Sequence, residues 1–174
     1  MSARPASVPV PTGPAPTLEV DLVGGGRFVL SAAAPERFTL VVFYRGWHCP
    51  ICRGYLAQLD RAADELARLG VEVVAVSGDD EARARRSVTE WGLARLRVGY
   101  GQSVDSMREW GLFVSRGVKE PEPELFGEPG GVLGACRWDD LHGGAQLHAS
   151  GASSRRRPGR GDPVLRRAGL PGER

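Results

Sequence analysis

The sequence has no apolar run of the length that a membrane-spanning helix requires. Residues 1–16 are mostly Pro, Ala, Ser and Thr, and they lack the apolar segment of a secretory signal. Both absences predict a protein of the reducing cytoplasm with no membrane partner. The chain has only three cysteines. In a reducing compartment, closely spaced cysteines are more typical of catalysis or metal binding than of structural disulfides.

A basic character is also lacking over most of the chain. The formal net charge is +2, but residues 131–174 hold eight Arg, no Lys and four acidic residues, a net charge of +4. Residues 1–130 therefore carry a net charge of 2 − 4 = −2. This balance does not predict the footprint of nucleic-acid binding, so we expect no nucleic-acid partner.

The length of 174 residues suits one domain with tails. Residues 1–17 are rich in proline and predict a flexible N-terminal lead-in. Alternating apolar and acidic residues at 18–23, three glycines at 24–26 and an apolar run at 28–30 predict a short β-hairpin.

The next segment has the pattern of a β-α-β unit. Residues 38–44 and 71–77 are apolar, β-branched runs that predict strands buried on both faces. Between them, apolar residues recur at steps of three and four, which predicts an amphipathic helix that ends at Gly70. The expected buried face of this helix consists of Ile51, Tyr55, Leu59, Ala62, Leu66 and Leu69. Two strands joined by such a helix are parallel, so we expect an α/β domain.

Periodicity weakens toward the C-terminus. We expect a loop and cap at 78–80, a helix over 81–91 with solvated arginines, a short strand at 96–100 and a helix capped by Ser103. Residues 111–129 predict an extended connection. From residue 131 onward Gly, Arg, Ala and Ser dominate without an apolar period, which predicts an unpacked tail. The expected organisation is a lead-in over 1–17, one folded domain over 18–130 and a tail over 131–174.

Two cysteines stand where the predicted strand meets the predicted helix, as Cys49-Pro50-Ile51-Cys52. Pro50 suits the first helical position, which places Cys49 just before the first turn. There, unpaired N–H groups and the helix dipole stabilise a thiolate. Cys52 lies one turn further on, with an expectedly more buried sulfur. Three neighbours in sequence can add positive potential: Arg45, His48 and Arg53. A Cys-x-x-Cys pair at this junction is a redox signal.

A resemblance to a known family rests on two segments, Phe43-Tyr44-Arg45-Gly46-Trp47-His48-Cys49-Pro50-Ile51-Cys52-Arg53 and Val73-Val74-Ala75-Val76-Ser77-Gly78-Asp79. Together they resemble the peroxiredoxin-like branch of the alkyl hydroperoxide reductase/thiol-specific antioxidant (AhpC/TSA) family, over about residues 18–129. The resemblance implies an α/β thioredoxin-like fold, with a central mixed sheet flanked by helices. It also implies a thiol-dependent antioxidant oxidoreductase, for which we expect no cofactor.

Carried over from this resemblance, Cys49 is the thiol that attacks a peroxide and becomes a sulfenic acid. Cys52 then condenses with it to a disulfide, and an external dithiol, such as a thioredoxin or glutathione system, resets the pair. The same residues fit a thioredoxin-type protein-disulfide reductase. One departure concerns the family pattern Pro-x-x-x-Thr-x-x-Cys, which has Val42 and Gly46 here, so the hydroxyl that helps to seat the peroxide is missing. The oligomeric state is left open.

Less reactive interpretations stand beside these. Cys49 and Cys52 fit buried, inert thiols, or half of a zinc site. The zinc ligands would be completed from Cys136, His142 or His148, which fall in the aperiodic tail, so we expect no metal. Three neighbouring residues have simpler roles: His48 as an exposed loop residue, Trp47 as a packing or rim residue, and Arg45 as the partner of a carboxylate.

The tail prompts a separate hypothesis. A thioredoxin-type sheet needs an antiparallel hairpin and a closing helix after its β-α-β half, and the resemblance stops near residue 130, where that hairpin should begin. We hypothesise that residues 131–174 are translated in a shifted reading frame, which leaves the hairpin and helix missing or disrupted. The chain would then be a truncated, non-catalytic thioredoxin-fold protein or binding module. The nucleotide sequence decides this.

Overall fold

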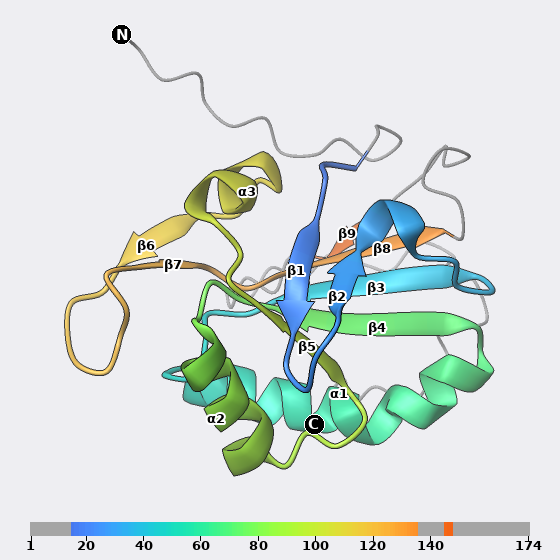
Figure 1. The fold of residues 1–174 in the computed structure, drawn as a ribbon, viewed down its shortest axis with the longest axis horizontal. Helices are drawn as coiled ribbons and strands as arrows, with labels where there is room; N and C mark the ends of the chain where they lie inside the picture. The colour runs from blue at the N-terminus through green and yellow to red at the C-terminus, as the bar shows by residue number, and fades with distance from the viewer. Residues whose placement is uncertain (1–14, 136–144, 148–174) are drawn as a thin grey trace, which may run out of the picture.

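The structure is a computed structural model that describes residues 15–135 and 145–147 (Figure 1). Its centre is a seven-stranded sheet in the order β2-β1-β5-β4-β3-β8-β9. These strands are β1 (Glu19–Leu22), β2 (Arg27–Val29), β3 (Phe38–Phe43), β4 (Val71–Val76), β5 (Arg97–Tyr100), β8 (Gly130–Ala135) and β9 (Ala145–Leu147). A separate two-stranded ribbon is formed by β6 (Val114–Arg116) and β7 (Leu125–Gly127).

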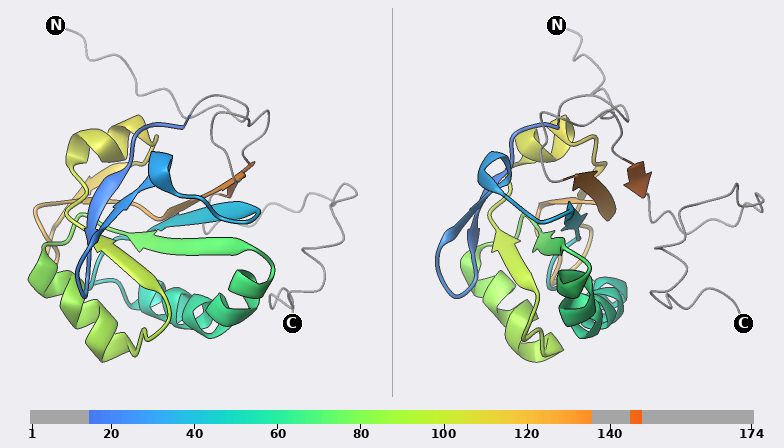
Figure 2. Two further views of the ribbon diagram at one scale, coloured as in Figure 1. Left: turned by 45° about the vertical axis from the view of Figure 1, so that its right-hand side comes forward. Right: turned by 90° about the vertical axis from the view of Figure 1, so that its right-hand side faces the viewer.

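Helices cover the central sheet on both faces. Helix α1 (Pro50–Arg68) and helix α2 (Glu81–Trp91) lie side by side on one face, as Figures 1 and 2 show. Beneath them lies a core cluster that includes Leu56, Ala75 and both cysteines of the motif. The other face has its own apolar cluster, in which Phe43 packs against Trp110 just beyond α3 (Val104–Glu109). A short 3-10 turn (Leu30–Ala32) follows β2.

The β-α-β expectation is confirmed. Strand β3 pairs in parallel with β4, and β4 pairs in parallel with β5, while the predicted hairpin appears as antiparallel β1 and β2. Phe43 is opposite Val76 at the last pair of β3 and β4. The segments that follow these two strands, 44–49 and 77–80, therefore leave the sheet at the same edge. The functional site is built at this edge.

The expected buried face of α1 is partly wrong. Ile51 is 82% exposed and Tyr55 is 51% exposed. The buried stripe instead runs through Cys52, Leu56 and Leu59. The cause is the docking of the helix on the sheet, which turns the stripe beginning at the second cysteine inward. Cys52, the second cysteine of the motif, is thus part of the buried stripe of α1.

The C-terminal expectation needs a correction as well. Strand β8 extends to residue 135, five residues past the expected end of the domain at 130, and pairs antiparallel with β3 along its whole length. Strand β9 pairs antiparallel with β8, so the hairpin that we expected to be missing or disrupted is present. The closing helix and the frame-shift hypothesis concern residues 136–144 and 148–174, which lie outside the described residues.

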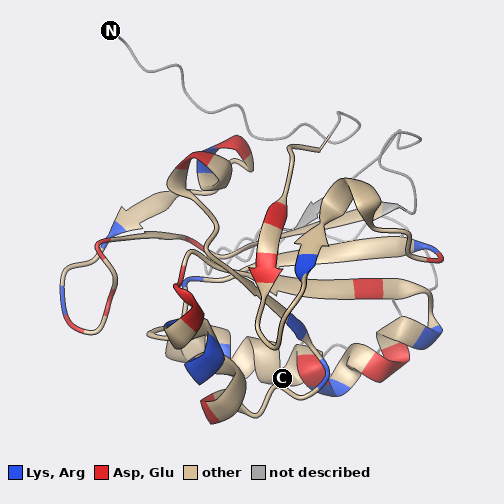
Figure 3. Cartoon of the chain, viewed as in Figure 1, with Lys and Arg blue, Asp and Glu red and all other residues tan. Residues whose placement is uncertain are grey.

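Charged residues of both signs alternate along the outer faces of α1 and α2 (Figure 3). Pairs one turn apart link Arg85 to Glu81 and Arg86 to Glu90 on α2. Exposed pairs of this kind contribute only a few tenths of a kcal/mol, roughly 0.3–0.5 each. In the part of the chain that the structure describes, no helix is long and apolar enough to cross a membrane.

Candidate active site

Cys49 is the N-cap residue of α1, and Pro50 occupies the first helical position, as the sequence predicts. The Cys49 N–H donates to the carbonyl of Gly46 at 3.1 Å, so residues 46–49 form a tight turn between β3 and α1. The Cys49 sulfur accepts the N–H of Cys52 at 3.2 Å. The helix start thus points a backbone donor directly at the sulfur, which is the arrangement that favours a thiolate.

The two sulfurs of the motif differ strongly in acidity. Hydrogen bonding from the Cys52 thiol lowers the pKa of Cys49 to about 6 against the opposing effect of burial, and the Cys52 N–H, the Arg45 charge and the Ile51 N–H assist. The same contact and burial raise the pKa of Cys52 far above its ordinary range. Both residues are buried and carry free thiols. At neutral pH the pair therefore consists of a Cys49 thiolate that accepts from a Cys52 thiol.

Arg45 lies beside this pair and packs against the β6–β7 ribbon. Its guanidinium carbon is 4.5 Å from the centre of the Phe126 ring. Its Nε is 3.4 Å from a carboxylate oxygen of Glu128, so the expected ion pair is present. That Nε is buried and has no hydrogen-bond partner among the described residues. Arg45 is thus a positively charged side chain whose Nε–H is left to donate a hydrogen bond to a substrate atom.

His48 is not the exposed loop residue that the sequence suggests. Its ring packs on Phe126, with ring centres 4.8 Å apart. Both ring nitrogens are buried without a hydrogen-bond partner in the described part of the chain. Burial lowers the pKa of His48 below its ordinary value despite the opposing charge of Asp79. The imidazole is therefore neutral at pH 7. The β6–β7 ribbon that buries it could not be located from local sequence.

Trp47 is a rim residue, as expected, and it links the turn to α2. Its indole N–H donates to Glu90 at 2.8 Å, and the Arg86 guanidinium lies 3.7 Å from its ring centre. The hydrogen bond from Trp47 and a second one from the Nε of Arg86 at 2.9 Å hold the pKa of Glu90 below its ordinary value, and the charge of Arg53 adds to the effect. Arg53 itself is exposed on the first turn of α1. The arginines of α2 are therefore not only a solvated face, because Arg86 stacks on the motif.

Asp79 is the site residue that the sequence analysis missed. Its side chain is fully buried at the end of β4. It accepts the backbone N–H of Trp47 at 2.7 Å and the Nε of Arg83 at 3.1 Å. The expected helix cap of this loop is the next residue, Asp80, which accepts the Arg83 N–H. Asp79 stands three residues after the end of β4, and a carboxylate in the loop that follows a buried parallel strand is the signal that could have identified it.

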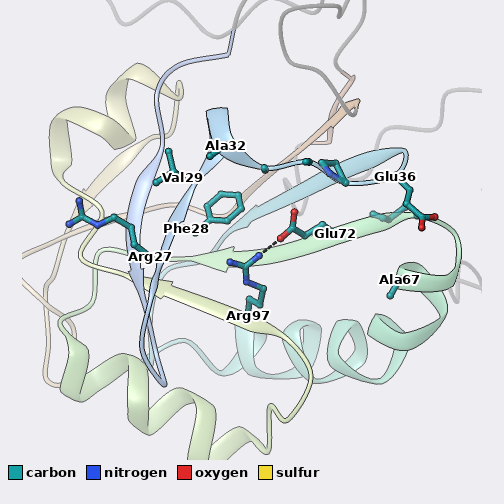
Figure 4. Close-up of a pocket in the computed structure, with 13 residues that line it drawn as sticks. Arg27, Phe28, Val29, Ala32, Glu36, Ala67, Glu72 and Arg97 are labelled. Atoms are coloured by element: carbon teal, nitrogen blue, oxygen red, sulfur yellow. Dashed lines mark hydrogen bonds and ion pairs between the residues drawn. The ribbon is translucent and has the colours of Figure 1, made fainter.

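The described residues contain no group of three or more His, Cys, Asp or Glu side chains that could hold a metal ion. The zinc ligands considered from the sequence, Cys136, His142 and His148, lie outside these residues. A cavity of about 630 Å³ lies elsewhere, between β2, the start of β4 and the end of α1 (Figure 4). The ion pair of Arg97 and Glu72 forms part of its wall. None of the residues that line this cavity belongs to the cysteine motif.

Comparison with known proteins agrees with this architecture. The model of the AhpC/TSA family matches residues 11–127. The fold is similar to that of peroxidoxin BcpB from Mycobacterium tuberculosis, with a TM-score of 0.60 at 13% identity over 72% of this chain and 79% of that chain. A peroxiredoxin-like protein from Aquifex aeolicus gives 0.60 at 13% identity, over 74% and 71% of the two chains. Peroxiredoxin Q from Xanthomonas campestris gives 0.56 at 18%, over 69% and 74%.

At these identities the structural likeness establishes the fold alone. The expected α/β thioredoxin-like fold, with a central sheet flanked by helices, is confirmed. The comparison with curated proteins gives no match.

Proposed function

Because the chain belongs to the AhpC/TSA family, we propose that it is a thiol-dependent peroxidase in which Cys49 attacks the peroxide and Cys52 resolves the product. The observation that carries the proposal is the asymmetry of the two thiols. Cys49 is an N-cap sulfur that accepts the Cys52 N–H, and its pKa is lowered to about 6. Cys52 is a buried thiol of raised pKa within the same turn.

The reaction follows from this asymmetry. The Cys49 thiolate forms a bond to one peroxide oxygen, the O–O bond breaks, and the departing alkoxide or hydroxide takes up a proton. The sulfur is oxidised to a sulfenic acid and the peroxide is reduced to an alcohol or water. The Cys52 thiol then attacks the sulfenic sulfur, water leaves, and a disulfide forms. An external dithiol of the thioredoxin or glutathione type reduces that disulfide by exchange.

The surroundings of Cys49 favour a small substrate. Cys49 is only 3% exposed, so a folded protein disulfide reaches its sulfur less easily than hydrogen peroxide does. The buried Nε of Arg45, which lacks a hydrogen-bond partner among the described residues, is the nearby donor for a peroxide oxygen. The Nε of Arg45 is the more important donor to the peroxide in this chain, because Gly46 has no side-chain hydroxyl that could share this role. We place the reaction in the reducing cytoplasm, where the dithiol systems operate.

A protein-disulfide reductase is the competing function, because the Cys-x-x-Cys pair at a helix start also suits dithiol exchange. A direct comparison of both activities in the full-length chain separates the two. We expect peroxide consumption with an excess of dithiothreitol, and reduction of insulin disulfides no faster than in a reaction without the protein. The Cys49→Ser variant should consume no peroxide. If the wild-type chain reduced insulin and consumed no peroxide, the protein would be a protein-disulfide reductase and not a peroxidase.

A further inference from the structure

We infer that Asp79 is a positioning residue for the Cys49 thiol, which it holds in place through the backbone of Gly46 and Trp47. The inference rests on the proposed role of Cys49 as the reacting thiol. It adds a residue that lies outside the cysteine motif and that comes from a different strand end.

Hydrogen bonds connect Asp79 to the sulfur-bearing turn. One carboxylate oxygen accepts the N–H of Trp47 at 2.7 Å, in the middle of the turn that closes from the Cys49 N–H to the Gly46 carbonyl. The side chain is fully buried, so this charge-assisted bond is shielded from water. The other oxygen accepts from Arg83 at 3.1 Å, which satisfies the buried charge. The turn is thereby fastened to the end of β4.

Gly46 fits the carboxylate so closely that a side chain there is excluded. Its φ of +122° lies in a region that favours glycine. A Cβ atom at this position would meet the Oδ1 of Asp79 at 2.5 Å. The family pattern has threonine at the position of Gly46, and in this chain the space beside the turn is filled by the Asp79 carboxylate instead. Gly46 and Asp79 therefore depend on each other, because the carboxylate can occupy its position only while residue 46 has no side chain.

Asp79 is itself held firmly, as a positioning residue requires. Its own N–H donates to the hydroxyl of Ser77 at 3.3 Å, and its carbonyl accepts the N–H of Gly101 at 2.8 Å. Arg83 extends the connection, because it also donates to the carbonyl of Pro121 at 2.7 Å. The turn, α2 and the loop of the β6–β7 ribbon thus meet at one carboxylate.

The acidity of Cys49 depends on this placement. Its sulfur receives the Cys52 N–H, the Cys52 thiol and the favourable charge of Arg45 only while the turn keeps its position. A loosened turn weakens these contacts and raises the pKa of Cys49. If Asp79 acted on Cys49 only through its negative charge, its removal would have the opposite effect, because the loss of a nearby anion lowers the pKa of a thiol. The sign of the shift therefore distinguishes positioning from simple electrostatics.

The test is the pH dependence of Cys49 alkylation by iodoacetamide in the reduced full-length protein, resolved by peptide mass spectrometry. For Asp79→Ala we expect the pKa of Cys49 to rise by about one unit or more, so that the thiolate fraction at pH 7 falls from about 0.9 to about 0.5 or less. Asp79→Asn keeps one acceptor for the Trp47 N–H and should give a smaller rise. Asp80→Ala is the matched control, because it removes the neighbouring carboxylate and helix cap without touching the turn. A lowered or unchanged pKa in Asp79→Ala overturns the inference.

A second measurement keeps the inference testable if Asp79→Ala folds poorly. Gly46→Ala should lower the melting temperature and the alkylation rate of the wild-type chain more than it lowers those of the Asp79→Ser chain, because the shorter serine side chain no longer places atoms where the carboxylate meets the added Cβ. Equal losses in both backgrounds overturn the proposed dependence. Alkylation needs no peroxide, so a chain without peroxidase activity still reports on Asp79. Absent turnover with the expected pKa shifts would instead refute the proposed function.

Discussion

Replacement of Cys52 separates its two roles, donation to the Cys49 sulfur and resolution of the sulfenic acid. Neither Cys52→Ala nor Cys52→Ser can form the disulfide, but only serine keeps a side-chain donor. Cys52 is buried one turn into α1, where its thiol is the largest influence that lowers the pKa of Cys49. The two variants should therefore differ in the acidity of Cys49 while they share the loss of turnover.

The size of the difference follows from the strength of the lost contact. A hydrogen bond to a charged group contributes about 1.5–3 kcal/mol, and one pKa unit corresponds to about 1.36 kcal/mol. Cys52→Ala should therefore raise the pKa of Cys49 by roughly 1–2 units, to about 7–8. The thiolate fraction at pH 7 then falls from about 0.9 to between about 0.5 and 0.1. The backbone N–H of residue 52 survives in both variants and limits the change.

The assay is the initial rate of Cys49 alkylation between pH 4 and about pH 9, a range that spans the ordinary thiol pKa. Peptide mass spectrometry distinguishes this site from Cys136. Cys52→Ser should titrate close to wild type, and Cys52→Ala should titrate clearly higher. Identical titrations for the two variants would refute the reasoning, because the side-chain donor would then have no effect.

Three further predictions follow from the site. Arg45→Gln should raise the pKa of Cys49 and slow the oxidation of Cys49 by hydrogen peroxide several-fold in stopped-flow measurements. The control Arg97→Gln changes a residue in the wall of the remote cavity and should have neither effect. Equal oxidation rates in the two variants would contradict the role of Arg45. The lowered pKa of Cys49 predicts that the free energy of unfolding of the reduced protein rises by roughly 3 kcal/mol between about pH 6 and about pH 8.5. Above that range it falls, because the raised pKa of Cys52 keeps this thiol protonated in the folded protein while the unfolded chain loses the proton. Urea unfolding should show no such rise in Cys49→Ser. His48→Phe should reduce the loss of stability below about pH 6.5, because the folded protein keeps His48 neutral while the unfolded chain protonates it, and an unchanged pH dependence of the urea midpoint would argue against this.

The sequence was most informative where structure depends on local pattern. The central strands, the extent of the main helix and its proline-led start all follow from apolar runs and capping preferences. The phase of the helix stripe does not, because residues at steps of three and four from Ile51 and from Cys52 give two stripes one residue apart. Docking on the sheet decides between them, and that is a tertiary property. The exposed Ile51 and Tyr55 are the result.

The missed parts of the site depend on contacts between distant segments. Asp79 meets Trp47 across 32 positions of sequence, so neither residue reveals the other locally. His48 looked exposed because the ribbon that buries it, through Phe126, comes from much later in the chain. Residues 131–135 show no apolar period, which predicts an unpacked segment, yet they pair as β8 with β3 and β9, two strands that local sequence does not bring together.

The most direct test of the central claim is the reaction of the fully reduced chain with one molar equivalent of hydrogen peroxide, followed by alkylation and peptide mass spectrometry. The account predicts a disulfide between Cys49 and Cys52 with Cys136 still alkylated, and in Cys52→Ser a sulfenic acid at Cys49 that a dimedone-type probe traps. Unchanged thiols at both positions after the peroxide has been supplied, or oxidation that begins at Cys52, would contradict it.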